Sequence, residues 1–317
     1  MISTLAGVKS IPQVPNSFFS FNVAKPEPAY NPKLFSSAFI NYIGQYQHHH
    51  IINKPYLWIV EEIKYQTEAE ALITKMFGEL SHLVNFLWFS KDNSISLLSL
   101  YFYSHAGEYM HLKDNLFRYS SCVGEYEECD LTAEDLRLAN EIYSKMIEII
   151  TPYKSKLPEM KEIKIGANPS RYNYLAYNQL TRIERALNFL NIARTQDYLP
   201  MKLTMYACVI ESLFSTDKQE VGHKISERAA VYLKGESNVM LENYKIFKRM
   251  YDYRSQFVHG SEFKIDTDAH KILAELSQRI DELIRQILLK IILKDSKTFT
   301  KNQKQLNDFF TELIFER

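Results

Sequence analysis

"MYDYRSQFVHGSEF", Met250 to Phe263, is the stretch that decides how the second half of the chain folds. It closes an aromatic run that begins at Asn243. Gly260 stands where a helix commonly ends, because glycine adopts a left-handed backbone conformation without strain. The stretch therefore predicts a helix over Asn243–Gly260. Its aromatic residues lie on several sides, which is typical of a helix that is mostly buried.

The sequence on both sides of this helix is also helical, almost without a break. Apolar residues recur at three- and four-residue spacing, which is the period of an amphipathic helix. The further helices that we predict here are Tyr174–Gln196, Leu199–Ser215, Glu220–Gly235, Asp268–Leu293 and Asn302–Phe315. Helices joined by short connections pack as antiparallel neighbours. Residues 166–317 are therefore predicted to form an antiparallel helical bundle.

The first half of the chain has a different pattern. Prolines at 12, 15, 26, 28, 32 and 55 favour an irregular segment over residues 1–54. Pro55–Ile63 and Ser94–Ser104 are rich in β-branched and aromatic residues, as strands are, and Glu68–Phe89 has helical periodicity.

A second predicted helix follows, and it leads into the predicted linker. Asp130–Ile150 opens on a capping box, in which Thr132 is followed three residues later by Asp135. The polar, basic stretch Pro152–Asn168 is interpreted as a linker. We therefore predict an α+β domain over residues 1–165, and a protein that is mainly α as a whole.

Composition narrows the class of protein. Hydrophobic residues are 46% and charged residues 24% of the 317, as in ordinary globular proteins, and Lys+Arg balance Asp+Glu at 38 each. A nucleic-acid site would therefore be a local patch, because the whole chain carries no net attraction for phosphates. The 3 cysteines form no paired framework. With no apolar run long enough to span a bilayer, these features favour a cytoplasmic protein without membrane contact.

Arg254 and His259 are the candidate reactive pair. Chance alone supplies about 0.3 Arg–His pairs at this spacing in a chain of 317 residues with 9 histidines, so the spacing by itself carries little weight. The alternative is structural: a histidine near a helix end interacts favourably with the helix dipole, and Arg254 lies at the surface or in a salt bridge. Against that, a charged pair is costly in a mostly buried helix unless it faces a cleft.

Helix geometry constrains how that pair can act. Five residues place the two side chains about 140° apart around the axis and about 7.5 Å apart along it. They share a site if the last turn loosens before Gly260, or if two copies of the helix meet across a two-fold axis.

"YDYRSQFVHG" resembles the signature of the HEPN superfamily of Arg-x4–6-His helical ribonucleases, and in particular its ApeA-like branch. "YACVIESLFS", which carries Glu211, resembles an earlier helix of that branch. "GHKISERAAVYL", which carries Arg228, resembles its middle helix. The resemblance covers the chain from about Tyr172 to the C-terminus, and the first half resembles no family that we can name.

The resemblance implies a bundle that dimerises through the Asn243–Gly260 helix, so that two motifs line one cleft. It implies a metal-independent endoribonuclease, with RNA as substrate and no cofactor, in antiphage defence or a toxin-type system. A regulatory or antitoxin protein is an expected partner, and a sensing role is expected for residues 1–165. In this reading Arg254 and His259 are catalytic. Histidine suits proton transfer near neutral pH, and arginine suits a crowded phosphate anion.

Four further residues are given supporting roles. Ser255 is placed to bind phosphate or to hold His259 one turn on, but it cannot replace a charged group. Tyr251 either lines the cleft or packs in the core, and packing is favoured by composition. Glu211 either orients Arg254 or is an exposed helix carboxylate. For Arg228 a structural ion pair is favoured over catalysis.

Other candidates are weaker. His48, His49 and His50 are consecutive, and three consecutive residues cannot all face one ion from a regular element, so no metal site is predicted. For a basic stretch in the linker (Lys154, Lys161, Lys164 and Arg171), simple exposure to solvent is favoured over contact with RNA phosphates. Two alternatives to the nuclease remain. One is a catalytically inactive HEPN module that dimerises and binds RNA or protein, and the other is a structural helical protein.

Overall fold

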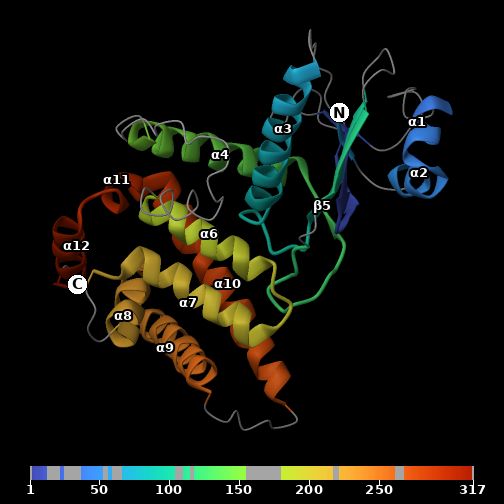
Figure 1. The fold of residues 1–317 in the computed structure, drawn as a ribbon. Helices are drawn as coiled ribbons and strands as arrows, with labels where there is room; N and C mark the ends of the chain where they lie inside the picture. Colours follow the sequence, from blue (N-terminus) through green and yellow to red (C-terminus); the bar gives the residue numbers. More distant parts are fainter. Residues whose placement is uncertain are drawn as a thin grey trace. The chain divides into compact units, whose positions relative to one another are not determined.

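The computed structural model describes residues 2–12, 22–24, 37–52, 56–58, 66–103, 110–114, 118–154, 180–216, 221–260 and 268–315 (Figure 1). The chain divides into two compact units. Unit 1 is Met1–Ser121 with Glu125–Tyr143, and unit 2 is Cys122–Gly124 with Ser144–Arg317. The predicted boundary at residues 165 and 166 lies outside the described residues.

Unit 1 contains an antiparallel sheet of five strands in the order β3-β4-β1-β5-β6. The strands are β1 (Ile2–Ala6), β3 (Asn22–Ala24), β4 (Tyr56–Trp58), β5 (Ser96–Tyr103) and β6 (Met110–Asp114). Leu5, Leu97 and Leu100 are buried, so the β1–β5 pair lies in the core of this unit. Two short parallel strands, β2 (Val8–Ser10) and β7 (Cys129–Asp130), form a second sheet.

The prediction that residues 1–54 are irregular is wrong for the part that the structure describes. That part holds the central strand β1, the edge strand β3 and the helices α1 (Ser37–Ile43) and α2 (Gln45–Ile52). Each of these elements fits between prolines: β1 ends before Pro12, and β3 lies between Pro15 and Pro26. Proline is excluded from element interiors but tolerated at their ends, so the prolines delimit elements here.

The longer elements of unit 1 agree with their sequence patterns. Helix α3 (Gln66–Leu87) and strand β5 confirm the predictions for Glu68–Phe89 and Ser94–Ser104, and β4 lies within the predicted strand Pro55–Ile63. The apolar residues of α3 that are known to be buried follow three- and four-residue spacing: Ile73, Met76, Leu80, Leu83, Val84, Phe86 and Leu87. That spacing turns one stripe of the helix toward the core.

Helix α4 (Ala133–Lys154) begins at the predicted capping box. The Thr132 backbone N–H donates to Asp135 Oδ2 at 2.8 Å, and the Asp135 N–H donates to Thr132 Oγ1 at 3.2 Å. The division between the two units falls inside this helix, after Tyr143. The first three residues of the predicted linker, from Pro152, belong to α4, and residues 155–179 lie outside the described part.

All the secondary-structure elements that the structure describes in unit 2 are helices, so the chain is mainly α as predicted. Its helices are α6 (Arg182–Arg194), α7 (Leu199–Phe214), α8 (Val221–Leu233), α9 (Ser237–His259), α10 (Ala269–Lys290), α11 (Ser296–Phe299) and α12 (Gln303–Phe315). Helix α7 contacts α6, α8, α9 and α10 and is the most extensively buried of them (Figure 1). Its Phe214 packs edge-on against Tyr232 and Phe299, so an alanine there would cost about 3–5 kcal/mol.

Three helix boundaries of unit 2 differ from the sequence prediction. Helix α6 starts at Arg182, because Thr181 caps it and Glu184 closes a capping box. Helix α9 starts at Ser237, six residues before the predicted Asn243. After Lys290 the predicted single helix widens into a π-helix, Ile291–Asp295, whose longer hydrogen-bond loops leave no signal in the apolar spacing.

Candidate active site

The end of α9 is built as the glycine predicts. Helix α9 continues to His259, and Gly260 then takes the left-handed conformation with φ 67°. The Gly260 N–H points at the carbonyl oxygens of Gln256 and Phe257, which satisfies acceptors that the helix end would leave open. Among the described residues outside the helix's own backbone and the chain neighbours, no atom lies within 4 Å of a Cβ added at Gly260, so glycine serves the backbone angle there.

Arg254 lies one turn before this end and reaches toward α7. Its Nη2 is 3.9 Å from Oε1 of Glu211, which is an ion pair but is too long for a hydrogen bond. Its Nε is buried and has no hydrogen-bond partner. The side chain is 33% exposed, and its terminal nitrogens donate no hydrogen bond to the residues that the structure describes. The guanidinium is therefore held in place while its donors stay available.

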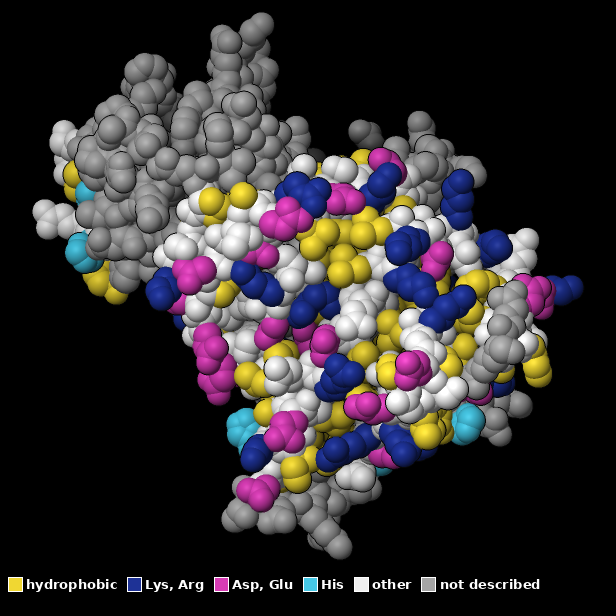
Figure 2. All heavy atoms as spheres, turned by 180° about the vertical axis from the view of Figure 1, so that it is seen from behind, with side chains coloured by type: hydrophobic (Ala, Val, Ile, Leu, Met, Phe, Trp, Pro, Cys, Tyr) yellow, Lys and Arg dark blue, Asp and Glu magenta, His cyan; other side chains and the backbone are white. Residues whose placement is uncertain are grey.

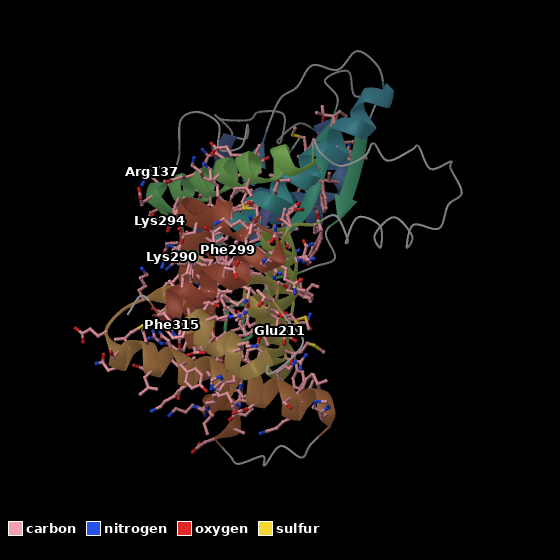
Figure 3. The ribbon with its side chains drawn as sticks, turned by 90° about the vertical axis from the view of Figure 1, so that its left-hand side faces the viewer. Arg137, Glu211, Lys290, Lys294, Phe299 and Phe315 are labelled. Atoms are coloured by element: carbon pink, nitrogen blue, oxygen red, sulfur yellow. The ribbon has the colours of Figure 1, made fainter. Side chains whose placement is uncertain are left out.

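Glu211 is the anionic neighbour of that guanidinium (Figure 3). Burial raises the pKa of its carboxyl above the ordinary value, and the nearby Arg254 opposes the shift only in part. The same two groups act on the Cys208 thiol, whose pKa is raised first by burial and then by Glu211. Of the two readings of Glu211, the structure gives the one in which it faces Arg254 across the bundle.

Tyr251 belongs to the core. Its side chain is 6% exposed, and its hydroxyl lies 3.5 Å from the carbonyl oxygen of Ala207, at the outer limit of a hydrogen bond. Its ring lies 3.7 Å from where a Cβ on Gly222 would be. Burial, with Glu211 adding to it, raises the tyrosine pKa well above its ordinary value. The packing alternative is therefore the one that the structure shows.

His259 and Ser255 lie on the exposed side of α9. Neither forms a hydrogen bond with any residue in the described part of the chain, so Ser255 does not hold His259 there. The helix stays regular through His259, and the loosened last turn that would bring Arg254 and His259 together is not found. Within one chain the pair keeps the offset of about 140° that an ideal helix gives. One site that uses both side chains therefore needs a second copy.

Arg228 is not part of this cluster. Its Nη1 donates to the Phe214 carbonyl oxygen at 2.9 Å and to Thr216 Oγ1 at 2.8 Å, and its Nη2 donates to Asn307 Oδ1 at 2.7 Å. The guanidinium also lies over the Phe310 ring, 4.9 Å from its centroid. Arg228 therefore ties α8 to the end of α7 and to α12, which is a structural role, but these partners are neutral acceptors and not the acid of the predicted ion pair.

Sequence reasoning missed the apolar neighbours of the α9 end. The Tyr198 ring packs edge-on against Phe257 at 5.9 Å, yet Tyr198 stays 58% exposed. Val258, next to His259, is 52% exposed. The Tyr198–Phe257 contact joins residues 59 positions apart, and no spacing within a single helix could have signalled it.

The remaining sequence candidates gain nothing from the structure. His48, His49 and His50 are consecutive residues of α2, and no group of three His, Cys, Asp or Glu side chains that could hold a metal occurs among the residues described. Lys161, Lys164 and Arg171 lie outside the described residues. No helix of the described part is both long and apolar enough to cross a membrane.

Comparison of the chain with protein-family models, with curated proteins and with solved structures finds no match. The function of the site therefore has to be argued from its own geometry and from the sequence signature.

Proposed function

We propose that this protein is a cytoplasmic, metal-independent endoribonuclease with a HEPN-like bundle, in which Arg254 and His259 of two copies form a composite site. The observation that carries the proposal is the state of Arg254. The Arg254 side chain is one-third exposed, its Nε is buried, and its terminal nitrogens donate no hydrogen bond to any described residue, so its guanidinium is suited to bind an anion. His259, exposed at the same helix end, supplies a group that titrates near neutral pH.

The chemistry needs no group beyond these side chains and the RNA. One histidine removes the proton from a ribose 2′-OH, and the 2′-oxygen attacks the adjacent phosphorus. The bond between phosphorus and the 5′-oxygen breaks, and that oxygen takes a proton from a water molecule, to which the protonated histidine gives up its proton. The products are a 2′,3′-cyclic phosphate and a 5′-OH. Arg254 stabilises the added negative charge on the phosphate oxygens in the transition state.

The proposal needs two copies because Arg254 and His259 of one copy lie on different sides of α9. The exposed surface beside His259 supports such pairing, since Tyr198 and Val258 expose apolar area there. A two-fold axis at this end would cover that area and bring each Arg254 toward the other copy's His259. We expect unit 1, or a separate regulatory or antitoxin protein, to control the site, which rests on analogy with the family alone.

The test is cleavage of a fluorescent single-stranded RNA by the full chain in EDTA. Wild-type protein should cut, and Arg254→Ala and His259→Ala should each lose about a hundredfold or more of the rate. Products should carry a cyclic phosphate. If wild type and both variants cut at the same rate, another site or a contaminant is responsible and the proposal fails.

Mixing the two inactive variants tests the composite site. A mixed dimer keeps one intact Arg254 facing one intact His259, so an equal mixture should regain up to about a quarter of the wild-type rate. Failure to regain activity, with exchange of subunits shown by native mass spectrometry, would contradict a site shared in this way.

A second candidate function is an HEPN-like module that binds RNA or protein without cutting. Ser255 favours it: the residue after the arginine is uncharged, exposed and without contact to His259 in the described part. In that case wild-type protein would bind the RNA in the same assay and leave it intact, while Arg254→Ala would weaken the binding.

A further inference from the structure

A row of lysines lies in unit 2 away from the C-terminal end of α9. Lys290, Lys294, Lys297 and Lys301 are spaced by four, three and four residues, and we call them the lysine stripe. The stripe begins at the last residue of α10, crosses the π-helix Ile291–Asp295 and α11, and ends at Lys301, two residues past the end of α11. Lys294, Lys297 and Lys301 are exposed, and none of them forms an ion pair with any residue that the structure describes.

The first lysine of the stripe is fixed in place. Lys290 Nζ donates to the carbonyl oxygen of Tyr232 and lies 4.3 Å from the centroid of the Tyr232 ring (Figure 3). Burial lowers the pKa of this amine, the nearby Asp295 opposes the shift in part, and Lys234 and Lys294 lower the pKa further. Lys234 and Lys294 are thus close enough to repel Lys290, a cost that a bound polyanion would reduce.

The one acid within this segment is already engaged. Asp295 Oδ2 accepts a hydrogen bond from the Tyr232 hydroxyl at 2.6 Å, in a contact that turns it toward α8. The π-helix sets this arrangement, because Ile291–Asp295 is the widened segment between Lys290 and α11. It carries Lys294 to the exposed side and Asp295 to Tyr232. Helices α11 and α12 lie on the left in Figure 1 and therefore on the right in Figure 2, which is turned by 180°. Lys and Arg side chains gather on that side of the surface in Figure 2.

We propose that the lysine stripe binds the sugar–phosphate backbone of RNA as a surface separate from the α9 end. A nucleic-acid backbone fits because its charges repeat along a line, as the stripe's do, and because no apolar residue of this row is exposed to enter a bilayer. Lys290 binds Tyr232 at the end of α8, where α9 begins. Counted from Ser237, the rise of α9 places Arg254 about 26 Å and His259 about 33 Å away along that helix.

The stripe therefore needs no participation from the candidate active site. It supplies affinity without base specificity, since phosphate contacts position a nucleic acid and do not read its sequence. It holds whether the α9 end cuts RNA or only binds it.

The test measures binding of a 20-nucleotide 2′-O-methyl RNA by fluorescence anisotropy between about 50 and 200 mM salt. This strand lacks the 2′-OH nucleophile, so binding is measured without cleavage. The stripe variant is Lys294→Gln, Lys297→Gln and Lys301→Gln; Lys290 is kept because it contacts Tyr232. A control with the same change in charge replaces three other exposed lysines, Lys9, Lys245 and Lys271, by Gln.

We expect the stripe variant to bind at least about tenfold more weakly at the lowest salt, and the slope of log affinity against log salt to shrink by about 2, for three lost single-strand contacts. The control should bind like wild type. Equal binding by the stripe variant and wild type, or no binding by wild type, overturns the proposal. So does stripe-dependent binding to phosphatidylserine vesicles without RNA binding. Because the strand cannot be cleaved, a loss of binding in the stripe variant does not depend on whether the α9 end cuts RNA, which separates this proposal from the nuclease.

Discussion

Two arginines of unit 2 show how differently one side chain can be used. Around Arg228, the terminal nitrogens make three hydrogen bonds at 2.7 to 2.9 Å, and the aromatic ring of Phe310 covers the group. Around Arg254, the nearest acid lies at 3.9 Å, and one-third of the side chain is open to solvent. Both terminal nitrogens of Arg228 are engaged by the fold, although its Nε, like that of Arg254, is buried without a hydrogen-bond partner among the described residues, whereas the terminal nitrogens of Arg254 have donors left for a ligand. Engagement of the terminal nitrogens, more than burial, separates a structural arginine from a binding one.

The largest expected effect is on the open arginine. Arg254→Ala should lower the rate of RNA cleavage by about a hundredfold or more, because it removes the charge that stabilises the transition state. The free energy of unfolding should change by less than about 1 kcal/mol, because only one long, partly exposed ion pair is lost. Rates of cleavage and urea unfolding curves measure the two effects.

Arg249→Ala is the matched control for that variant. Arg249 is an exposed arginine of the same helix, and its guanidinium lies over the Tyr253 ring at 5.7 Å. It should cut RNA at nearly the wild-type rate. If both variants lose activity equally, the effect is one of helix charge and not of the position of Arg254.

Arg228 should show the reverse pattern, with a large loss of stability and little loss of activity. Arg228→Ala leaves the Phe214 carbonyl, Thr216 and Asn307 without their shared donor in a buried place. The free energy of unfolding should fall by about 3 kcal/mol. Cleavage per folded molecule should stay near wild type, as measured by active-site titration below the unfolding transition. A variant that stays fully stable but stops cutting would place Arg228 in the reaction.

The sequence predicted the end of α9 but not what faces it. Gly260 fixes the last residue of the helix locally, because the left-handed angle suits glycine and few other residues. The start of α6 is also determined by nearby residues, the capping box of Thr181 and Glu184, yet the apolar periodicity before them favoured a longer helix. In both places the residue that decides the boundary is polar or small, and the apolar pattern alone misplaces it.

Contacts between distant segments were beyond the sequence. The approach of Glu211 to Arg254 depends on how α7 crosses α9, and the Tyr198–Phe257 contact depends on a residue before α7. Strand β1 lies between β4 and β5 because of pairings that span more than 50 residues. Periodicity reports which face of an element is buried, but it does not say which element covers it.

The ion pair between Glu211 and Arg254 can be tested through the pH dependence of stability. Its folded pKa is raised above the ordinary value of 4.5, so the folded state binds the proton more tightly than the unfolded chain does. The stability that this contributes is complete at acid pH and is lost as pH rises through the raised folded value. The burial cost of the charged carboxyl therefore outweighs its attraction to Arg254 in the neutral range.

Glu211→Gln removes that titration. Relative to wild type, the Gln variant should gain stability as pH rises from 4.5 toward neutrality, as measured by urea unfolding at a series of pH values. Asp135 provides the opposite case within unit 1, since hydrogen bonds from Lys91 and Thr132 lower its pKa despite burial. A Gln variant that loses stability with rising pH would mean that the ion pair dominates and that Arg254 is anchored more firmly than the 3.9 Å distance implies.

The smallest expected effect is at Tyr251, where both stability and the rate of cleavage should change little. Tyr251→Phe removes a hydroxyl whose contact with the Ala207 carbonyl oxygen is 3.5 Å, so the free energy of unfolding should change by no more than about 0.5 kcal/mol. The rate of RNA cleavage should change by less than about threefold, because a side chain that is 6% exposed does not reach a substrate. A tenfold loss of rate with unchanged stability would mean that the hydroxyl acts on Arg254, and that the open arginine is less independent of the core than the structure indicates.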